Sequence, residues 1–358
     1  MLQNNFIYLI LVTIFAYIFV IKYWVSIAQY YNIDNYGTVQ KIHKKPTPRL
    51  AGLISFICLL LYLVFFNNSS SFLFYKIIVL GFLPLAIISI KEDIFHDTKP
   101  YNRLLMMIIS SLLTFNLFDF QFPELNIFFL RSILVFDFTN IIFFTFCVCI
   151  LINGFNFIDG TNGLLGFNSL LQNSIVAFLA YQINDIYIFN ITLIFFPFIF
   201  VYLLFNFPYG KIFAGDFGAY FYGFYLANIT ILLFYRNPDL SPYYAVIILI
   251  YPAFEVFFSL LRKKLKKINP TEPDLNHLHS KIYVYLVLKN IDPRISNSLV
   301  CIILLPLILF GPFSVFLLFD NNSMWLQKSL IICFVGFYLF LYSALIKLER
   351  SIDKSKEK

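Results

Sequence analysis

The sequence contains few charged residues and few of the residue types that build turns, disulfides and metal centres. Of its 358 residues, 13% are charged, and there are only 13 glycines, 5 cysteines and 4 histidines. A soluble domain carries about 25% charged residues, so this chain is not an ordinary cytosolic enzyme. So little glycine excludes a collagen-like repeat. The cysteines are odd in number and all lie in apolar runs, which predicts neither a disulfide framework nor a zinc site.

Hydrophobic residues, in contrast, make up 60% of the chain and include 47 phenylalanines. A membrane helix needs about 20 apolar residues. The sequence therefore predicts an all-α polytopic membrane protein, one integral membrane domain over residues 1–358 with a bundle of about 11 transmembrane helices. The first run has no small-residue cleavage site and is expected to be a retained span. The polar stretch 262–294 is expected to be a loop. The expected spans are 6–30, 51–66, 72–90, 104–118, 128–152, 164–182, 186–206, 217–235, 241–261, 295–318 and 326–346.

The basic residues predict the orientation of the chain. The formal net charge is +7, from 26 Lys and Arg against 19 Asp and Glu. With eleven spans, most of the basic residues fall on one side, which the positive-inside rule assigns to the cytoplasm. We therefore expect the N-terminus outside and the C-terminus inside. Orientation and contact with membrane lipids account for the positive charge, and no nucleic-acid partner is expected.

Every unusual polar cluster falls on this predicted cytoplasmic face, at the ends of spans. The clusters lie at residues 43–52, 91–103, 153–163, 206–218 and 273–279. We therefore expect an active site at the cytoplasmic face. Four carboxylates there are of the kind that binds Mg²⁺: Glu92, Asp93, Asp159 and Asp216. Four basic side chains have the charge that phosphate binding requires: Lys45, Arg49, Arg103 and Lys211.

Glycine-containing turns at 160–163 and 215–218 would let backbone N–H groups approach an anion at a helix start. His277 and His279 lie in the last cluster and would point the same way in an extended segment. Together these groups predict phosphoryl transfer to or from a lipid-borne group, in which positioning and charge neutralisation dominate. Glu255 lies near the inner end of the ninth span. It could form a structural ion pair with Arg262, which is within helical spacing, or be a functional carboxylate, and the sequence favours neither.

A transporter or flippase of lipid-linked sugars is the alternative. A transporter would place its polar residues near the bilayer midplane, on interrupted helices. Here the clusters lie at span ends on one side, which favours an enzyme.

These clusters resemble the motifs of the polyprenyl-phosphate N-acetylhexosamine-1-phosphate transferases. The first resembling motif comprises Lys41, His43 and 48–52, with Ala51 where a glycine is usual. Glu92-Asp93 resembles the paired acidic motif, usually Asp-Asp, with Arg103 at the basic position that follows. The segment with Asn153, Asn156, Asp159, Gly160, Asn162, Gly163 and Leu164 matches a third motif. Gly215-Asp216-Phe217-Gly218, after Asn206, Pro208 and Lys211, matches a fourth. The segment 274–279 resembles the histidine motif, with Ser280 in place of a third histidine.

The resemblance implies a reaction. A lipid phosphate oxygen attacks the β-phosphorus of a UDP-N-acetylhexosamine, UMP leaves, and a polyprenyl (undecaprenyl) diphosphate sugar remains. The implied cofactor is Mg²⁺, with Mn²⁺ as the alternative ion, and Asp216 and Asp159 are the expected ligands. Asp93, Glu92 and Asp216 are the expected catalytic residues. The expected substrate-binding residues are Lys45, Arg49, Arg103, Asn153, Asn156, Asp159, Asn162, Lys211, His277 and His279.

Glu92 and the missing third histidine resemble the branch that acts in O-antigen or capsule assembly. The expected location is the bacterial inner membrane, where the product would initiate lipopolysaccharide or cell-wall polymer synthesis. The sequence leaves open which UDP-sugar is the donor, whether Glu92 or Asp93 is the principal acid, and whether the protein is a homodimer.

Overall fold

The computed structural model of the chain describes residues 2–31, 47–66, 71–118, 134, 136–270, 272, 276–319 and 323–356. Over these residues the secondary structure is helical, with turns and loops between the helices and no strand. The predicted all-α class is therefore confirmed. The helices are Leu2–Tyr31 (α1), Ala51–Phe65 (α2), Phe72–Phe95 (α3), Pro100–Phe118 (α4), Asp137–Ile158 (α6), Leu164–Gln182 (α7), Ile186–Asn206 (α8), Gly215–Arg236 (α9), Tyr243–Ile248 (α10), Ile250–Leu265 (α11), Leu278–Leu288 (α12), Pro293–Leu318 (α13) and Met324–Lys356 (α14).

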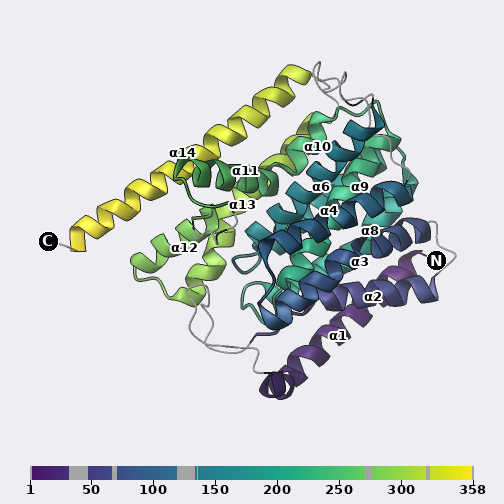
Figure 1. Cartoon of the computed structure of the whole chain (residues 1–358), viewed down its shortest axis with the longest axis horizontal. Helices are drawn as coiled ribbons and strands as arrows, with labels where there is room; N and C mark the ends of the chain where they lie inside the picture. Colours follow the sequence, from purple (N-terminus) through teal and green to yellow (C-terminus); the bar gives the residue numbers. More distant parts are fainter. Residues whose placement is uncertain are drawn as a thin grey trace.

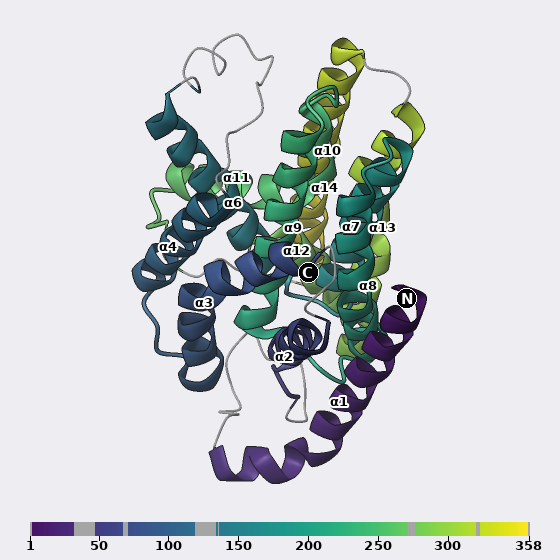
Figure 2. The ribbon, with the colours of Figure 1, turned by 90° about the vertical axis from the view of Figure 1, so that its right-hand side faces the viewer.

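Helix α9 forms the centre of the bundle, and nearly all of its residues are buried. It packs against α2, α3 and α6 and also against α7 and α8. Figure 2 shows α3, α4 and α6 on one side of α9, with α7, α8 and α13 on the other. Helices α1 and α14 lie at opposite sides of the bundle (Figure 1). Few residues in the apolar part of either helix are buried, as in a helix facing lipid.

The predicted count of eleven spans is not confirmed. In the described part of the chain, nine helices are long and apolar enough to cross a membrane: α1, α3, α4, α6, α7, α8, α9, α13 and α14. Helix α2 follows its predicted run but has only 15 residues, fewer than the 20 or so that a perpendicular span needs. A multi-pass membrane protein is nevertheless what these nine helices define.

The ninth predicted span is broken into α10 and α11 at Leu249. Two neighbours adjoin the break. The Gln172 side chain of α7 donates a hydrogen bond to the Ile248 carbonyl at 3.2 Å. Gly311 of α13 lies so close to the Ile247 carbonyl that a Cβ there would come within 2.1 Å of its oxygen. A carbonyl freed from the helix ladder is thus satisfied inside the protein, as a membrane interior requires.

The expectation that residues 262–294 form a loop is wrong. Helix α12 occupies Leu278–Leu288 within this stretch. It packs against α13 and α14, and Leu278, Ile282 and Leu286 are buried. These positions follow the i, i+4, i+8 spacing of one helical face, so a short amphipathic helix is stabilised here by tertiary packing.

Candidate active site

The turn before α2 is bonded directly to the segment that precedes α9. The Phe213 N–H donates to the Pro48 carbonyl at 2.8 Å, and the Ala51 N–H donates to the Phe213 carbonyl at 3.1 Å. The two helices then touch without side chains between them, because a Cβ on Gly52 would lie 2.0 Å from the Gly218 Cα. These contacts place Arg49 beside the first turn of α9.

Asp93, at the end of α3, provides the cap for α9. Its Oδ1 accepts a hydrogen bond from the Asp216 N–H at 2.8 Å, and its Oδ2 accepts one from the Phe217 N–H at 2.9 Å. The first N–H groups of a helix have no partner within the helix, so a carboxylate from α3 satisfies them here. Gly215 makes the approach feasible, since it has φ +74° and a Cβ would be 2.6 Å from Asp93 Oδ2. Asp93 is buried as a result.

Asp216 lies at the centre of the charged residues. Its Oδ2 accepts a hydrogen bond from Arg103 Nη1 at 3.1 Å, and its Oδ1 accepts one from Asn156 Nδ2 at 3.3 Å. Arg49 Nη2 lies 3.5 Å from Asp216 Oδ1, and Arg49 Nε lies 3.8 Å from Asp93 Oδ1. Side chains from α4 and α6 and from the turn before α2 therefore meet at one carboxylate of α9.

Glu92 adjoins this cluster but has different partners from Asp93. Its Oε2 accepts hydrogen bonds from the Thr98 N–H, at 3.0 Å, and from the Thr98 hydroxyl. Arg103 Nη1 lies 3.9 Å from its other oxygen. Glu92 thus closes the turn between α3 and α4 and faces Arg103, whereas Asp93 faces the start of α9.

Asp159, in the turn after α6, is the carboxylate of this group with no hydrogen bond or ion pair to its side chain among the described residues. Burial raises the pKa of Asp159 to about 7; Arg49 opposes the shift, and Asp216 and Asp93 add to it. The smaller contribution of the neighbouring acids reflects an excess of negative charge. Four carboxylates, Glu92, Asp93, Asp159 and Asp216, surround two guanidinium groups in the described part of the site.

This excess of negative charge fits a divalent cation. Over the described ranges, no group of three or more His, Cys, Asp and Glu side chains is arranged to hold a metal ion. Mg²⁺ does not require such a group, since it is commonly bound by one or two carboxylates together with substrate phosphates. Both oxygens of Asp93 accept backbone N–H groups of α9. The oxygens of Asp216 instead face the side chains of the cluster, and Asp159 accepts no hydrogen bond among the described residues, so these two are the candidate ligands.

Two of the predicted asparagines have other partners. Asn153 Nδ2 donates to the Cys149 carbonyl at 2.8 Å and lies 3.2 Å from the Met107 sulfur, which directs it toward α4. The Asn162 side chain donates to the Pro208 carbonyl at 2.9 Å, and its backbone N–H donates to Asn297 of α13 at 2.6 Å. Asn162 therefore joins the α6–α7 turn to the α8–α9 connection, and its contacts do not include the carboxylate cluster.

The two predicted histidines lie beside the α6–α7 turn. His277 immediately precedes α12, and His279 is in its first turn, so the expected extended pair is wrong for His279. Their rings are parallel, with 3° between planes and 5.6 Å between centroids. A Cβ on Gly160 would lie 2.1 Å from His279 Nε2, so this ring touches the residue next to Asp159.

Of the predicted basic residues, Lys211 is exposed on the connection between α8 and α9. Lys45 lies outside the described residues, as do Lys41, His43, Asp274 and Leu275 of the resembling motifs. Sequence reasoning missed Tyr220, whose hydroxyl donates to Asp216 Oδ2 at 3.5 Å. Tyr220 lies four residues after Asp216 on the same helix, and this spacing could have indicated their contact.

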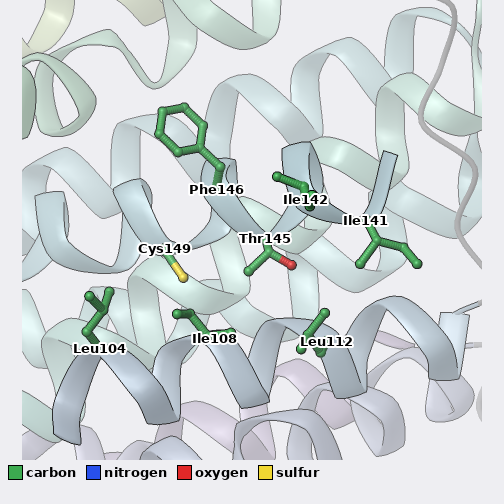
Figure 3. A pocket seen from close by; sticks show the side chains of 8 residues that line it. All are labelled: Leu104, Ile108, Leu112, Ile141, Ile142, Thr145, Phe146 and Cys149. Atoms are coloured by element: carbon green, nitrogen blue, oxygen red, sulfur yellow. The ribbon is translucent and has the colours of Figure 1, made fainter. Parts of the chain in front are cut away.

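A groove opens between α4 and α6. Its volume is about 390 Å³, and Figure 3 shows Leu104, Ile108 and Leu112 on one helix opposite Thr145 and Cys149 on the other. Leu104, at one end, directly follows Arg103. Apart from one threonine and one cysteine, the lining side chains are hydrocarbon. The lining residues are Leu104, Ile108, Leu112, Ile141, Ile142, Thr145, Phe146 and Cys149.

The fold and the site define an integral membrane enzyme whose charged cluster lies at helix ends and suits phosphate chemistry. The family model of glycosyl transferase family 4 matches residues 75–234, which include α3 through most of α9. This part of the chain is similar to the family, as its motifs indicate.

Three relatives illustrate the similarity. The chain is 31% identical over 134 residues to a Bacillus subtilis protein named probable undecaprenyl-phosphate N-acetylglucosaminyl 1-phosphate transferase, a match covering 37% of each chain. It is 26% identical over 242 residues to the undecaprenyl-phosphate alpha-N-acetylglucosaminyl 1-phosphate transferase of Thermotoga maritima, covering 67% of this chain and 69% of the relative. It is 27% identical over 240 residues to the phospho-N-acetylmuramoyl-pentapeptide-transferase of Dictyoglomus turgidum, covering 64% and 75%. The alignment thus spans little more than a third of the Bacillus relative.

Proposed function

We propose that this protein transfers an N-acetylhexosamine 1-phosphate from a UDP-sugar to a polyprenyl phosphate such as undecaprenyl phosphate, releasing UMP. The observation that carries the proposal is the position of Asp216. It is held between Arg49, Arg103 and Asn156. Arg103 directly precedes Leu104, which lines an apolar groove. The relatives, named as transferases acting on undecaprenyl phosphate or phospho-N-acetylmuramoyl-pentapeptide, support the same class of reaction.

In this reaction a phosphate oxygen of the lipid forms a bond to the β-phosphorus of the UDP-sugar. The bond from that phosphorus to the oxygen bridging the two phosphates breaks, and UMP takes the bridging oxygen and its electron pair. Arg49 and Arg103 bind and orient the phosphates, because guanidinium groups pair with phosphate oxygens in a fixed geometry. Asp216 and Asp159 would hold Mg²⁺ or Mn²⁺, which neutralises the charge that develops on the pyrophosphate oxygens.

On this proposal Asp93 and Glu92 have different roles. Asp93 lies beside Arg49 and holds the first turn of α9 in place, so we assign it the positioning or deprotonation of the lipid phosphate. Glu92 contacts Thr98 and Arg103, so we assign it the orientation of Arg103. On this assignment Asp93 is the principal acid of the pair.

We assign the prenyl chain of the lipid acceptor to the groove between α4 and α6. Its wall is apolar, and Arg103 adjoins Leu104 at one end. A prenyl chain lying between Ile108 and Ile142 would bring its phosphate toward Arg103. Apolar pockets with a few polar groups at one end are typical of small-molecule sites.

For the environment of the site, we propose the bacterial inner membrane with the N-terminus outside and the C-terminus and charged cluster inside. The distribution of Lys and Arg supports this orientation. His277, His279, Lys211 and Lys45 would contact the phosphates or the sugar. The motif departures support a role in O-antigen, capsule or cell-wall polymer synthesis. The rival proposal, a transporter of lipid-linked sugars, is less well supported because the charged cluster lies at helix ends.

The test uses the purified full chain in detergent with a short polyprenyl phosphate, Mg²⁺ and a panel of UDP-amino sugars, and it measures UMP release. We expect release with at least one donor, dependent on both lipid and Mg²⁺. D216N should lose Mg²⁺-dependent release, while D239N, an acid on the α9–α10 connection beyond the C-terminal end of α9, should retain it. No release from any donor, alongside movement of lipid-linked sugar in vesicles, would instead favour transport.

A further inference from the structure

Glu255 of α11 is completely buried and has both carboxylate oxygens engaged. Tyr338 of α14 donates its hydroxyl to Oε1 at 2.8 Å. Nδ1 of His277 lies 3.1 Å from Oε2. The partner within helical spacing, Arg262, lies instead over the rings of Phe258 and Tyr342. Since a buried carboxylate is costly unless its oxygens are bonded, the choice of partners here is informative.

The partner His277 belongs to the candidate site. Its ring lies 4.8 Å from that of Phe157 and stacks on His279, whose Nε2 touches Gly160. A continuous line of contacts therefore runs from Glu255 through two imidazole rings to the turn that contains Asp159. No such line would be needed for a carboxylate that only joined two helices.

The hydrogen bond sets which nitrogen of His277 is free. A carboxylate accepts from Nδ1–H, which leaves Nε2 on the opposite edge of the ring to bind a substrate group. Such partners fix both the tautomer and the orientation of a functional histidine. The parallel stacking on His279 further restricts rotation of the ring.

Helix α14 holds this arrangement in place through one of its faces. Besides Tyr338, the Tyr342 hydroxyl donates to the Asn276 carbonyl at 3.1 Å, and Glu349 pairs with Lys281 of α12 at 3.0 Å. Positions 338, 342 and 349 are four and seven residues apart, which places them on the same side of a helix. Helix α14 thus contacts the segment that contains His277 and His279 on both sides, at Asn276 and at Lys281.

We propose that Glu255, itself held by Tyr338, is a positioning residue that orients His277 for phosphosugar transfer. This inference rests on the proposed function. Glu255 touches none of the groups that would react, so it acts through His277 alone. A Glu255 that served only as a structural ion pair would affect folding stability and leave the reaction of folded protein unchanged.

The experiment is a double-mutant cycle on the purified full chain, with kcat/KM measured from UMP release. E255Q keeps the shape of the side chain but removes its charge, and we expect a loss of about 10- to 100-fold, the usual cost of an orienting partner. H277A should lose at least as much. The double variant should be no worse than H277A, because Glu255 has nothing left to orient. The inference would be overturned if the losses of kcat/KM in E255Q and H277A multiplied in the double variant. It would also be overturned if the kcat/KM of E255Q lay within about twofold of wild type.

Two further variants separate positioning from stability. D185N removes a buried acid that lies beyond the end of α7 opposite the Asp159 turn. It should lower the melting temperature without changing kcat/KM. If E255Q does not fold, Y338F carries the test. It removes one hydroxyl and should lower kcat/KM about 3- to 10-fold in the wild-type background and not at all beside H277A. An unchanged Y338F would then count against the inference.

The two proposals fail in different ways. A wild-type chain that releases no UMP from any donor overturns the proposed function and this inference with it. An active wild type whose Glu255 and Tyr338 variants are equally active overturns the inference alone.

Discussion

Asp93 of α3 and Asp216 of α9 are joined by a hydrogen bond from the backbone of one to the carboxylate of the other. The Asp216 N–H donates to Asp93 Oδ1 at 2.8 Å, and the Phe217 N–H donates to the second oxygen. The acid that caps α9 therefore also orients the acid that α9 presents to the site. Either residue would be misplaced without the other.

D93N should reduce turnover at least 100-fold and leave UDP-sugar binding nearly intact. An amide has one oxygen, so one N–H of α9 would lose its partner, at a cost of about 1–3 kcal/mol. The charge beside Arg49 would be lost as well. UMP release gives the turnover, and ligand-induced thermal shift gives the binding. D97N is the control, because Asp97 is mostly exposed and pairs with Lys91. Wild-type turnover in D93N would remove the catalytic role of Asp93.

G215A should destabilise the protein and abolish activity. A left-handed backbone costs a residue with a Cβ about 1–2 kcal/mol. The Cβ would also lie 2.6 Å from the Arg49 carbonyl and from Asp93. The melting temperature in detergent measures the loss. G336A is the matched control, since nothing lies within 4 Å of a Cβ there. Equal melting temperatures for the two variants would contradict the described geometry at Gly215.

I108W should raise the KM for the polyprenyl phosphate several-fold with little effect on the KM for the UDP-sugar. The indole would fill the groove between α4 and α6. L113W is the control, because Leu113 is exposed on the same helix but does not line the groove. The prediction fails if both variants change the lipid KM equally.

Lower pH should raise the Mg²⁺ concentration needed for half-maximal activity. Because burial and the neighbouring acids raise the pKa of Asp159 to about 7, it is ionised at pH 8 and mostly protonated at pH 6. Protons and metal then compete for one carboxylate, so the requirement should rise about tenfold per pH unit below 7 and level off above it. UMP release titrated with Mg²⁺ at several pH values measures this. A pH-independent requirement would contradict a metal role for Asp159.

D185N should lower the free energy of unfolding by about 0.5–2 kcal/mol, because the charge that pairs with Arg236 is lost. Asparagine still caps α8. Burial alone would raise the pKa of Asp185, but hydrogen bonds from Arg236, Asn237 and the Ile188 N–H lower it below the ordinary value. The ionised form is therefore favoured in the folded state. Its stabilisation is present above the unfolded-state pKa of about 4 and is lost as the pH falls below that value. A melting temperature equal to that of wild type at pH 7 would contradict this.

The positions of the helices could be predicted because lipid imposes a local rule. Each apolar run near the bilayer length forms a helix, since every backbone group must be bonded within its own segment. The rule does not fix exact ends. It predicted the run that forms α2 but counted this short helix as a span. It also missed the break at Leu249, which Gln172 and Gly311 from other helices adjoin. It also missed α12, whose apolar face is covered by α13 and α14.

By itself, the sequence determined the class of the protein and the residues of the charged cluster, because charge is so costly in this apolar chain that its few clustered charges stand out at the ends of apolar runs. Only the tertiary structure decided how those residues pair. Asp93 and Asp216 are 123 residues apart, and Glu255 and Tyr338 are 83 apart. No periodicity links such positions. They meet because α3 abuts α9, and α11 lies near α14, through packing that depends on the whole bundle.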